Sequence, residues 1–402
     1  MRRENWFLIT TLLYVLYTIF PLFADLISIP VWLPSIFAIS VMMILYPAAF
    51  KNKFFYWFCA YAAVLALYVL IGKPLTIGIG TVHDSKKIFI EYAYLLPTVG
   101  VLSILYYLKD KSLNRKLVFW AIILLYISFV FEVPLMRQYG SIREALRESD
   151  QEINILGLPS YSLMHAYTLM IPAACYAIRV SRERNKIIAL FALLVLAFVV
   201  YNTFVTTSLL LMVAAMVYLF AYKESSTATR AGVVVLLMFI FFVIYETGGL
   251  VSFIRWIMPA FEGTAVEPKL LDMEQSMISG HFEGGTITGR QSLHQQSWDA
   301  FWHNPIVGTS GAVGGHSALI DRLGGMGLLA FVPFLMMILS AIKMLSSLFS
   351  TKQARTFFMA GIIMGFAFMY TKGLWGSEAW LLYFVLMPYS ISVFENKYFS
   401  SQ

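Results

Sequence analysis

Residues 109–135 read KDKSLNRKLVFWAIILLYISFVFEVPL, a short basic cluster followed at once by an apolar run. A mostly apolar run of about 20 residues is long enough to cross the hydrocarbon core of a membrane as one helix. Basic clusters beside such runs are typical of cytoplasmic loops, because Lys and Arg are enriched on that side of a membrane. The pattern recurs along the chain and predicts an all-α, polytopic membrane protein.

The composition of the whole chain agrees with this pattern. Hydrophobic side chains make up 59% of the 402 residues and charged ones only 13%, whereas soluble domains are roughly 45–50% apolar. The formal charge of +7 comes from Lys and Arg in short clusters between apolar runs, where they orient spans and contact anionic lipid. We therefore expect a lipid bilayer around the chain and no nucleic-acid partner. Cys59 and Cys175 each lie inside an apolar run, so we expect neither a disulfide nor a zinc site.

Counting the apolar runs predicts about twelve transmembrane helices. They lie near 6–24, 31–50, 54–71, 88–108, 116–135, 160–179, 187–205, 207–222, 231–249, 316–345, 355–372 and 377–394. The run after the N-terminal MRRENW has no cleavage site, so we expect it to remain as the first span. The basic clusters at 2–3, 51–53, 109–116, 179–186, 223–230 and 343–355 all fall on one side, which predicts that this side and both termini are cytoplasmic. With no repeat of fixed period, we expect one transmembrane domain over 1–402, with an extracytoplasmic loop inserted at 250–315, before the last three spans.

The end of this loop gathers most of the polar chemistry of the chain. Residues 289–327 read GRQSLHQQSWDAFWHNPIVGTSGAVGGHSALIDRLGGMG. Thr288 is the predicted N-cap of a helix that begins near Arg290 and ends at His303. Helical spacing places Arg290, His294, Ser297 and Phe301 on one face, and the helix is expected to lie on the membrane surface as a lid or shelf. A loop of this length usually carries function, so we expect the active site here.

The order of residues in this stretch resembles the signature of the O-antigen polymerase and O-antigen ligase superfamily. The matching residues are Arg290, Trp298, Asn304, Pro305, Gly308, Gly315, His316, Ser317, Asp321, Leu323 and Gly327. Ligases of this superfamily tend to carry His-Asn where this chain has His316 and Ser317, so the sequence is more similar to Wzy-type polymerases. One element departs from the family pattern: a Thr-x-Ser-Arg motif in a middle span corresponds here to residues 206–209, TTSL, which lack the arginine.

The resemblance implies a GT-C-like membrane glycosyltransferase. The reaction would transfer a glycan from undecaprenyl diphosphate to a sugar hydroxyl of a second lipid-linked repeat unit, with inversion at the anomeric carbon. Arg290 would then bind the diphosphate, because a guanidinium binds phosphate oxygens through two donors and stays charged. His316 would accept the proton of the attacking hydroxyl or orient that hydroxyl. Asp321 would fix the His316 imidazole or bind sugar hydroxyls; the alternative is a salt bridge with Arg322 or Lys372.

Further candidate substrate-binding residues lie around this core. Trp298 could stack on a sugar ring or anchor the loop at the membrane interface, and His294 and Ser317 are polar neighbours of the motif. External basic clusters could supply the missing phosphate ligand, or could be ordinary surface charges; the candidates are Lys73, Lys87, Arg137 and Arg143. We expect no metal and no cofactor, although Asp272-Met273-Glu274 resembles a metal-binding Asp-x-Asp element.

Several functions fit this pattern. The first is polymerisation of O-antigen, capsular or exopolysaccharide repeat units in the inner membrane of a bacterium, with an extracytoplasmic active site and a chain-length regulator as a candidate partner. The second is an O-antigen ligase, whose acceptor is lipid A core. A flippase or other transporter matches the number of spans, but transporters usually place their charged residues inside broken helices. A sensor or structural membrane protein with a binding loop is the remaining alternative.

Overall fold

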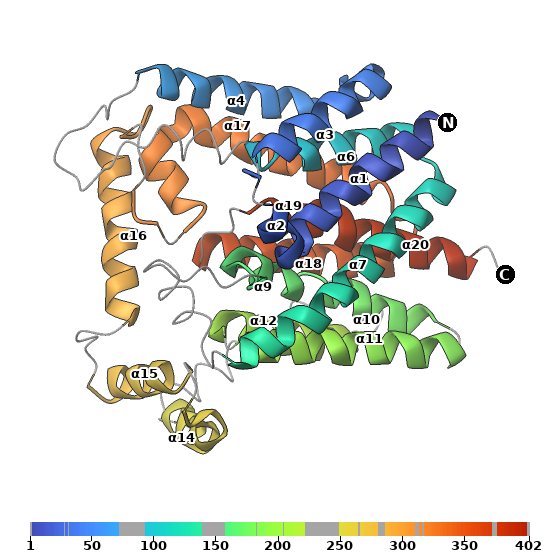
Figure 1. Ribbon diagram of the computed structural model, residues 1–402. Helices are drawn as coiled ribbons and strands as arrows, with labels where there is room; N and C mark the ends of the chain where they lie inside the picture. The colour runs from blue at the N-terminus through green and yellow to red at the C-terminus, as the bar shows by residue number, and fades with distance from the viewer. Residues whose placement is uncertain are drawn as a thin grey trace.

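The computed structural model describes residues 2–27, 29–30, 32–71, 93–138, 157–181, 183–203, 205–221, 249–263, 266–279, 286–309, 313–315, 317–371 and 376–399. These residues form helices, with no strand among them (Figure 1). The elements are α1 (Arg3–Ile19), α2 (Pro21–Ile27), α3 (Trp32–Leu45), η1 (Pro47–Phe50), α4 (Lys53–Ile71), α6 (Leu96–Leu108), α7 (Lys111–Gln138), α9 (Tyr161–Thr168), α10 (Ile171–Val180), α11 (Glu183–Asn202), α12 (Thr206–Ala221), α14 (Gly249–Ile257), η2 (Met258–Phe261), α15 (Glu267–Ser279), α16 (Thr286–His303), α17 (Ile320–Ser346), α18 (Lys352–Thr371), α19 (Ser377–Leu381), the π-helical turn η3 (Leu382–Leu386) and α20 (Met387–Phe399).

Seven helical segments are long and apolar enough to cross a membrane. They are Lys53–Leu70, Lys111–Gln138, Tyr161–Val180, Asn185–Asn202, Ile320–Ser346, Lys352–Thr371 and Ser377–Glu395. The apolar helices Trp32–Leu45, Leu96–Leu108 and Thr207–Phe220 are shorter and coincide with three further predicted spans. The predicted span 231–249 lies outside the described residues except for its last one. The all-α, polytopic architecture is therefore supported, and the count of twelve spans remains a prediction.

The first predicted span, 6–24, is broken in the structure. Helices α1 and α2 meet at a bend of 96° around Phe20 and Pro21. Proline lacks a backbone N–H and disfavours helical backbone at the residue before it, so a helix tends to end at that point. The break is the reason why this segment counts as an eighth span only if both helices are taken together.

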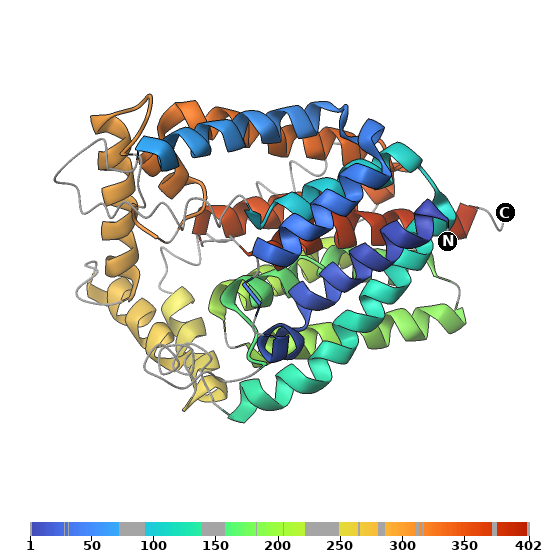
Figure 2. The ribbon, with the colours of Figure 1, turned by 45° about the horizontal axis from the view of Figure 1, so that its top comes forward.

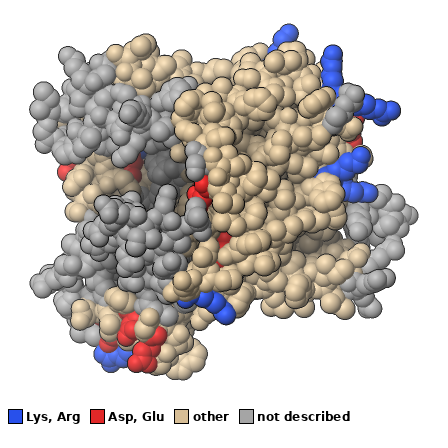
Figure 3. All heavy atoms as spheres, in the orientation of Figure 1, with Lys and Arg blue, Asp and Glu red and all other residues tan. Residues whose placement is uncertain are grey.

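Basic side chains gather at one end of the described part of the helix bundle. Both termini lie at one end, here called the termini end, whereas α16 lies across the opposite end, here called the far end (Figures 1 and 2). On the face drawn in Figure 3, most of the visible Lys and Arg side chains gather at the termini end. The helices start there with basic residues, as Arg3 does in α1, Lys53 in α4, Lys111 in α7 and Lys352 in α18.

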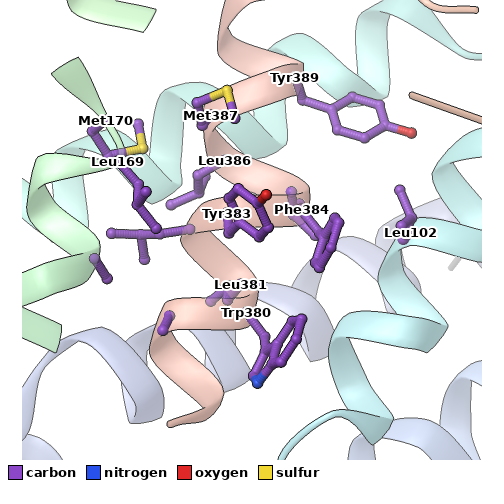
Figure 4. Packing of buried hydrophobic residues seen from close by; sticks show 14 of the residues in the cluster. Leu102, Leu169, Met170, Trp380, Leu381, Tyr383, Phe384, Leu386, Met387 and Tyr389 are labelled. Carbon is purple, nitrogen blue, oxygen red and sulfur yellow. The ribbon is translucent and has the colours of Figure 1, made fainter. Parts of the chain in front are cut away.

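The last membrane helix forms the centre of the bundle. Figure 4 shows side chains of α19, η3 and α20 packed between neighbouring helices. Trp380 stacks on Phe384 with ring centroids 5.4 Å apart and meets Phe334 of α17 edge to face at 6.0 Å. Tyr383 lies directly against Gly365 of α18, where a β-carbon would overlap its ring, and its hydroxyl donates to the Ile362 carbonyl at 2.9 Å. A glycine is therefore required at position 365 for α18 and the last helix to pack this closely.

A buried carboxylate fixes the turn between α17 and α18. Glu395 of α20 is only 3% exposed. It accepts hydrogen bonds from the Thr351 N–H at 2.6 Å, from the Ser350 N–H at 3.1 Å and from the Ser350 hydroxyl at 2.9 Å. The first N–H groups of a helix have no partner within the helix, and a negative charge is favourable beside them. Glu395 therefore ties the start of α18 to the end of the chain.

We expect Glu395→Ala to lower the free energy of unfolding by about 2–3 kcal/mol, because three charge-assisted hydrogen bonds are lost and two partly buried N–H groups lose this acceptor. Thermal unfolding of the purified protein in detergent measures this as a fall in Tm. Glu262→Ala, at an exposed glutamate after η2, is the matched control and should leave Tm unchanged. Equal Tm values for the two variants would contradict the stabilising role of Glu395.

Candidate functional site

The α16 helix carries the predicted site residues across the far end of the bundle. It begins at Thr286 rather than near Arg290, and it ends at His303 as predicted. Ser297 and Ala300 are fully buried against α17, whereas Trp302 is 71% exposed. Ser297, from the face predicted to carry Arg290, His294 and Phe301, therefore points at the bundle, a direction that the sequence did not predict. The backbone of Arg290 lies in the first half of the helix, but its side chain is outside the described part of the chain.

Asp321, in the first turn of α17, is the hub of this region. One carboxylate oxygen accepts a hydrogen bond from the Ser297 hydroxyl of α16 at 2.8 Å. The other accepts from the backbone N–H of Gly315 at 2.9 Å and from that of Ser317 at 2.8 Å. Asp321 is 7% exposed, so these donors replace the water that the carboxylate loses on burial. A single oxygen thus holds the residues on both sides of position 316, although His316 itself lies outside the described residues.

Ser317 links this hub to a third helix. Its hydroxyl caps the start of α17 by accepting from the Ile320 N–H at 3.1 Å, and it donates to the Met369 carbonyl of α18 at 3.3 Å. The N–H of Leu319 also donates to the Met369 carbonyl, at 3.1 Å. Ser317, a predicted substrate-binding residue, is fully buried in these contacts. The structure therefore gives Ser317 a role in fixing the backbone around position 316.

A break in α17 lies next to the hub. Gly327 has a φ of 59°, and the helix is interrupted there. The Leu328 and Leu329 N–H groups bind the carbonyls of Pro305 and Ile306 at 2.9 Å each, where an unbroken helix would use carbonyls of its own previous turn. Gly308 lies so close that a β-carbon there would be 2.5 Å from the Gly327 nitrogen. The turn after α16 thus supplies hydrogen-bond acceptors that the preceding turn of α17 would supply in an unbroken helix.

Two tyrosines of α4 reach this region from the bundle. The Tyr68 hydroxyl lies 3.0 Å from the Val307 carbonyl and 2.8 Å from the Met326 carbonyl, so it joins the turn to the break in α17. The Tyr61 hydroxyl accepts a hydrogen bond from Nε of Arg322 at 3.0 Å. Nothing in the local sequence distinguishes these tyrosines from the other aromatic residues of an apolar helix, so neither was predicted to lie at the site.

Arg322 is a buried cation that the sequence analysis considered only as a salt-bridge partner. It is 2% exposed, its Nη1 donates to the Ala318 carbonyl at 3.3 Å, and its guanidinium carbon lies 4.2 Å above the Phe334 ring. Asp321 faces α16, whereas Arg322, one residue on, faces Tyr61 and Phe334. A charge inside an apolar helix is costly unless it is paired, so its place in the predicted span 316–345 was the signal that could have identified it.

His294 lies one turn before Ser297 on α16. Its ring is 6.1 Å from that of Tyr370 at the end of α18. Its Nε2 atom is buried and has no hydrogen-bond partner among the residues that the structure describes. Buried polar atoms normally have partners, so this nitrogen is available to a ligand or to one of the neighbouring residues outside the described set.

The remaining predicted residues divide into two groups. Lys73, Lys87 and Arg143 lie outside the described residues. Trp298 is 36% exposed and meets Phe301 edge to face at 6.1 Å, which leaves its outer side open. Arg137, at the end of α7, donates from Nε to the Asn202 side chain at 2.9 Å, and its guanidinium carbon lies 4.9 Å above the Phe198 ring. Its contacts therefore join α7 to α11.

Ser208, in the 206–209 segment that departs from the motif of the resembling superfamily, is also buried. Ser208, in the first turn of α12, lies 2.8 Å from Nδ1 of His165 in α9. The His165 ring packs on Phe368 of α18 at 4.8 Å. Ser208 therefore joins α12 to α9. Neither a scan against models of protein families nor a search of curated proteins finds a match to this chain.

We expect Asp321→Ala to lower stability by about 3 kcal/mol, because three donors lose this acceptor, among them the buried Ser297 hydroxyl and the buried Ser317 N–H. Asp321→Asn should cost less, about 1 kcal/mol, because the amide oxygen can still accept from the two backbone N–H groups while the amide nitrogen donates to Ser297. Thermal unfolding ranks the variants. Asp299→Ala, at an exposed position of α16, is the control and should match the wild type. An alanine variant as stable as the control would contradict the role of Asp321 as hub.

Proposed function

We propose that this chain is a membrane glycosyltransferase that polymerises glycan repeat units carried on undecaprenyl diphosphate. The proposal rests on one observation above all: the Asp321 carboxylate fixes the backbone on both sides of His316 at the far end of the bundle. A general base must be held at a fixed distance and angle from the hydroxyl that it activates. A loop tied by one carboxylate to α16 and α17 meets that requirement for a histidine at position 316.

In the proposed reaction, a sugar hydroxyl of the acceptor repeat unit attacks the anomeric carbon of the donor glycan. The new bond joins the acceptor oxygen to this carbon, the bond to the diphosphate oxygen breaks, and undecaprenyl diphosphate leaves with the bonding electron pair. His316 takes the hydroxyl proton. Arg290 holds the diphosphate and stabilises its growing charge. Asp321 acts through the loop backbone as a positioning residue, and Trp298 offers an open aromatic side to a sugar ring.

The second phosphate-binding cation is assigned to one of the external basic residues. The candidates are Lys73, Lys87, Arg137 and Arg143. Arg137 is the one whose side chain the structure describes, and its Asn202 and Phe198 contacts leave other N–H groups of the guanidinium for a phosphate. His294, whose buried Nε2 has no hydrogen-bond partner among the described residues, is proposed to bind the substrate beside Ser297.

We further propose twelve spans in the inner membrane of a bacterium, with both termini in the cytoplasm and the site of residues 286–327 on the outside. The basic side chains at the termini end support this orientation through the positive-inside rule. The ninth span would lie in the interval between α12 and α14, at 231–249. The donor and the acceptor, both lipid-linked, would enter from the bilayer, and a chain-length regulator is a proposed partner.

The activity is tested by reconstituting the purified full chain in vesicles with an undecaprenyl diphosphate repeat unit and resolving the products on a gel. We expect a ladder for the wild type, a loss of at least a hundredfold in His316→Ala and Arg290→Ala, and a smaller loss in Asp321→Asn than in Asp321→Ala. His303→Ala, at an exposed histidine at the end of the same helix, is the control and should give the wild-type ladder.

Other products would identify the alternatives. A conjugate that forms only when lipid A core oligosaccharide is supplied would indicate a ligase. Movement of the lipid-linked unit across the vesicle membrane without a new glycosidic bond would indicate a flippase. Full activity in both the His316 and Arg290 variants would contradict the proposed site, and equal loss in the two Asp321 variants would contradict the positioning role.

The orientation is tested by labelling introduced cysteines in intact cells, after both native cysteines are replaced by Ala. Cys59 is exposed and could react, whereas Cys175 is buried. We expect a membrane-impermeant maleimide to label His303→Cys from outside, because α16 lies at the far end. Lys343→Cys, near the termini end of α17, should react only after the membrane is permeabilised. The opposite pattern would reverse the proposed topology.

A further inference from the structure

A cavity of about 650 Å³ lies between α7, α10, α11 and α20, in the half of the bundle nearer the termini end. Small side chains make the space, because α10 presents Ala173, Ala174 and Ala177 to it and α11 presents Ala189 and Ala192. The volume lies within the range of about 300–1,000 Å³ that is usual for ligand pockets. The walls are mainly apolar, so the cavity suits a hydrocarbon ligand.

The cavity has the length of one bilayer leaflet. Along α7 its lining runs from Arg115 to Tyr126, which is about 16 Å at 1.5 Å per residue. The hydrocarbon core of a bilayer is about 30 Å thick, so half of it is about 15 Å. At the deep end the Tyr126 hydroxyl donates to the Ala192 carbonyl of α11 at 2.7 Å. This bond holds α7 and α11 at a fixed separation where their side chains leave the space open.

The mouth of the cavity is polar and basic. Arg115, Ser181 and Asn185 line it. Arg115 is exposed, and the neighbouring Lys111 and Lys116 on α7 and Lys186 on α11 are exposed as well. Asp110 accepts from the Ser112 N–H at 2.7 Å and so caps the start of α7, and the side chain of Glu183, at the start of α11, is outside the described part of the chain. An anionic group is therefore favoured at the mouth, directly above an apolar channel.

We propose that this cavity binds one anionic glycerophospholipid of the leaflet at the termini end. One acyl chain fills the space along the alanines of α10 and α11, and the phosphate lies beside Arg115. The position at the termini end separates this lipid from the reaction proposed at the far end. The inference therefore does not depend on the proposed function.

The test is native mass spectrometry of the full-length protein in detergent, after incubation with phosphatidylglycerol or with phosphatidylethanolamine. We expect one phosphatidylglycerol to be retained per chain. Ala174→Phe fills the cavity and should lower retention at least tenfold. Arg115→Gln should lower it about fivefold, which corresponds to about 1 kcal/mol for one basic residue near an anionic head group. Val213→Phe, at a lipid-facing residue of α12, and Lys343→Gln are the matched controls and should retain lipid like the wild type.

A second measurement does not depend on variants. Phosphatidylglycerol with a photoreactive group at the end of one acyl chain should cross-link to peptides of α7 and α11 around Tyr126 and Ala192. Equal retention of the two phospholipids, or no effect of Ala174→Phe in a correctly folded sample, would overturn the proposal. Retention of undecaprenyl phosphate but not of phosphatidylglycerol, or cross-links confined to other helices, would overturn it too.

Discussion

The carboxylate of Asp321 is the constraint on which the far end of this protein depends. Its two oxygens accept hydrogen bonds from Ser297 of α16, from Gly315 in the glycine-rich loop and from Ser317, which caps α17. A carboxylate buried among apolar helices is costly unless hydrogen bonds replace its hydration. These segments must therefore converge on it. Ser317 donates its N–H to Asp321 and its hydroxyl to the Met369 carbonyl of α18, so the two bonds together fix the position of α18 relative to the loop.

The sequence predicted those parts of the fold that depend on local patterns. Hydrophobic runs predicted where helices occur, and helical spacing placed Ser297 on one face of α16 with His294, but it did not predict that Ser297 points at the bundle. The partner of Asp321 could not be predicted, because Ser297 is 24 positions away in the sequence and meets it only after a glycine-rich turn. The bend at Pro21 could have been predicted from the proline, but counting apolar residues does not register it. The different directions of Asp321 and Arg322 follow from the helix, in which consecutive side chains point about 100° apart.

Two ionisable residues inside the bundle, Glu132 and Arg322, have the same kind of partner. Glu132 in α7 is fully buried and accepts a hydrogen bond from Tyr167, and Arg322 donates to Tyr61 and lies over Phe334. Hydrocarbon offers no hydrogen bonds, so a membrane helix must provide a partner from a neighbouring helix. In both cases the partner is a tyrosine, which packs as an apolar ring and bonds through its hydroxyl. Aromatic residues therefore contribute polar contacts to an interior that the composition alone describes as hydrophobic.

The break in α17 limits how the length of the turn after α16 can change. The N–H groups of Leu328 and Leu329 use the carbonyls of Pro305 and Ile306, and the Gly324 carbonyl accepts from Thr309 at 3.3 Å. Two backbone N–H groups of α17 are thus bonded to carbonyls of the turn after α16 and not to carbonyls of α17 itself. Inserting or deleting a residue between 305 and 309 would move the carbonyls of this turn away from the N–H groups of α17 and leave those N–H groups unpaired. Homologues should therefore conserve the number of residues in this turn more strictly than the identity of its exposed side chains.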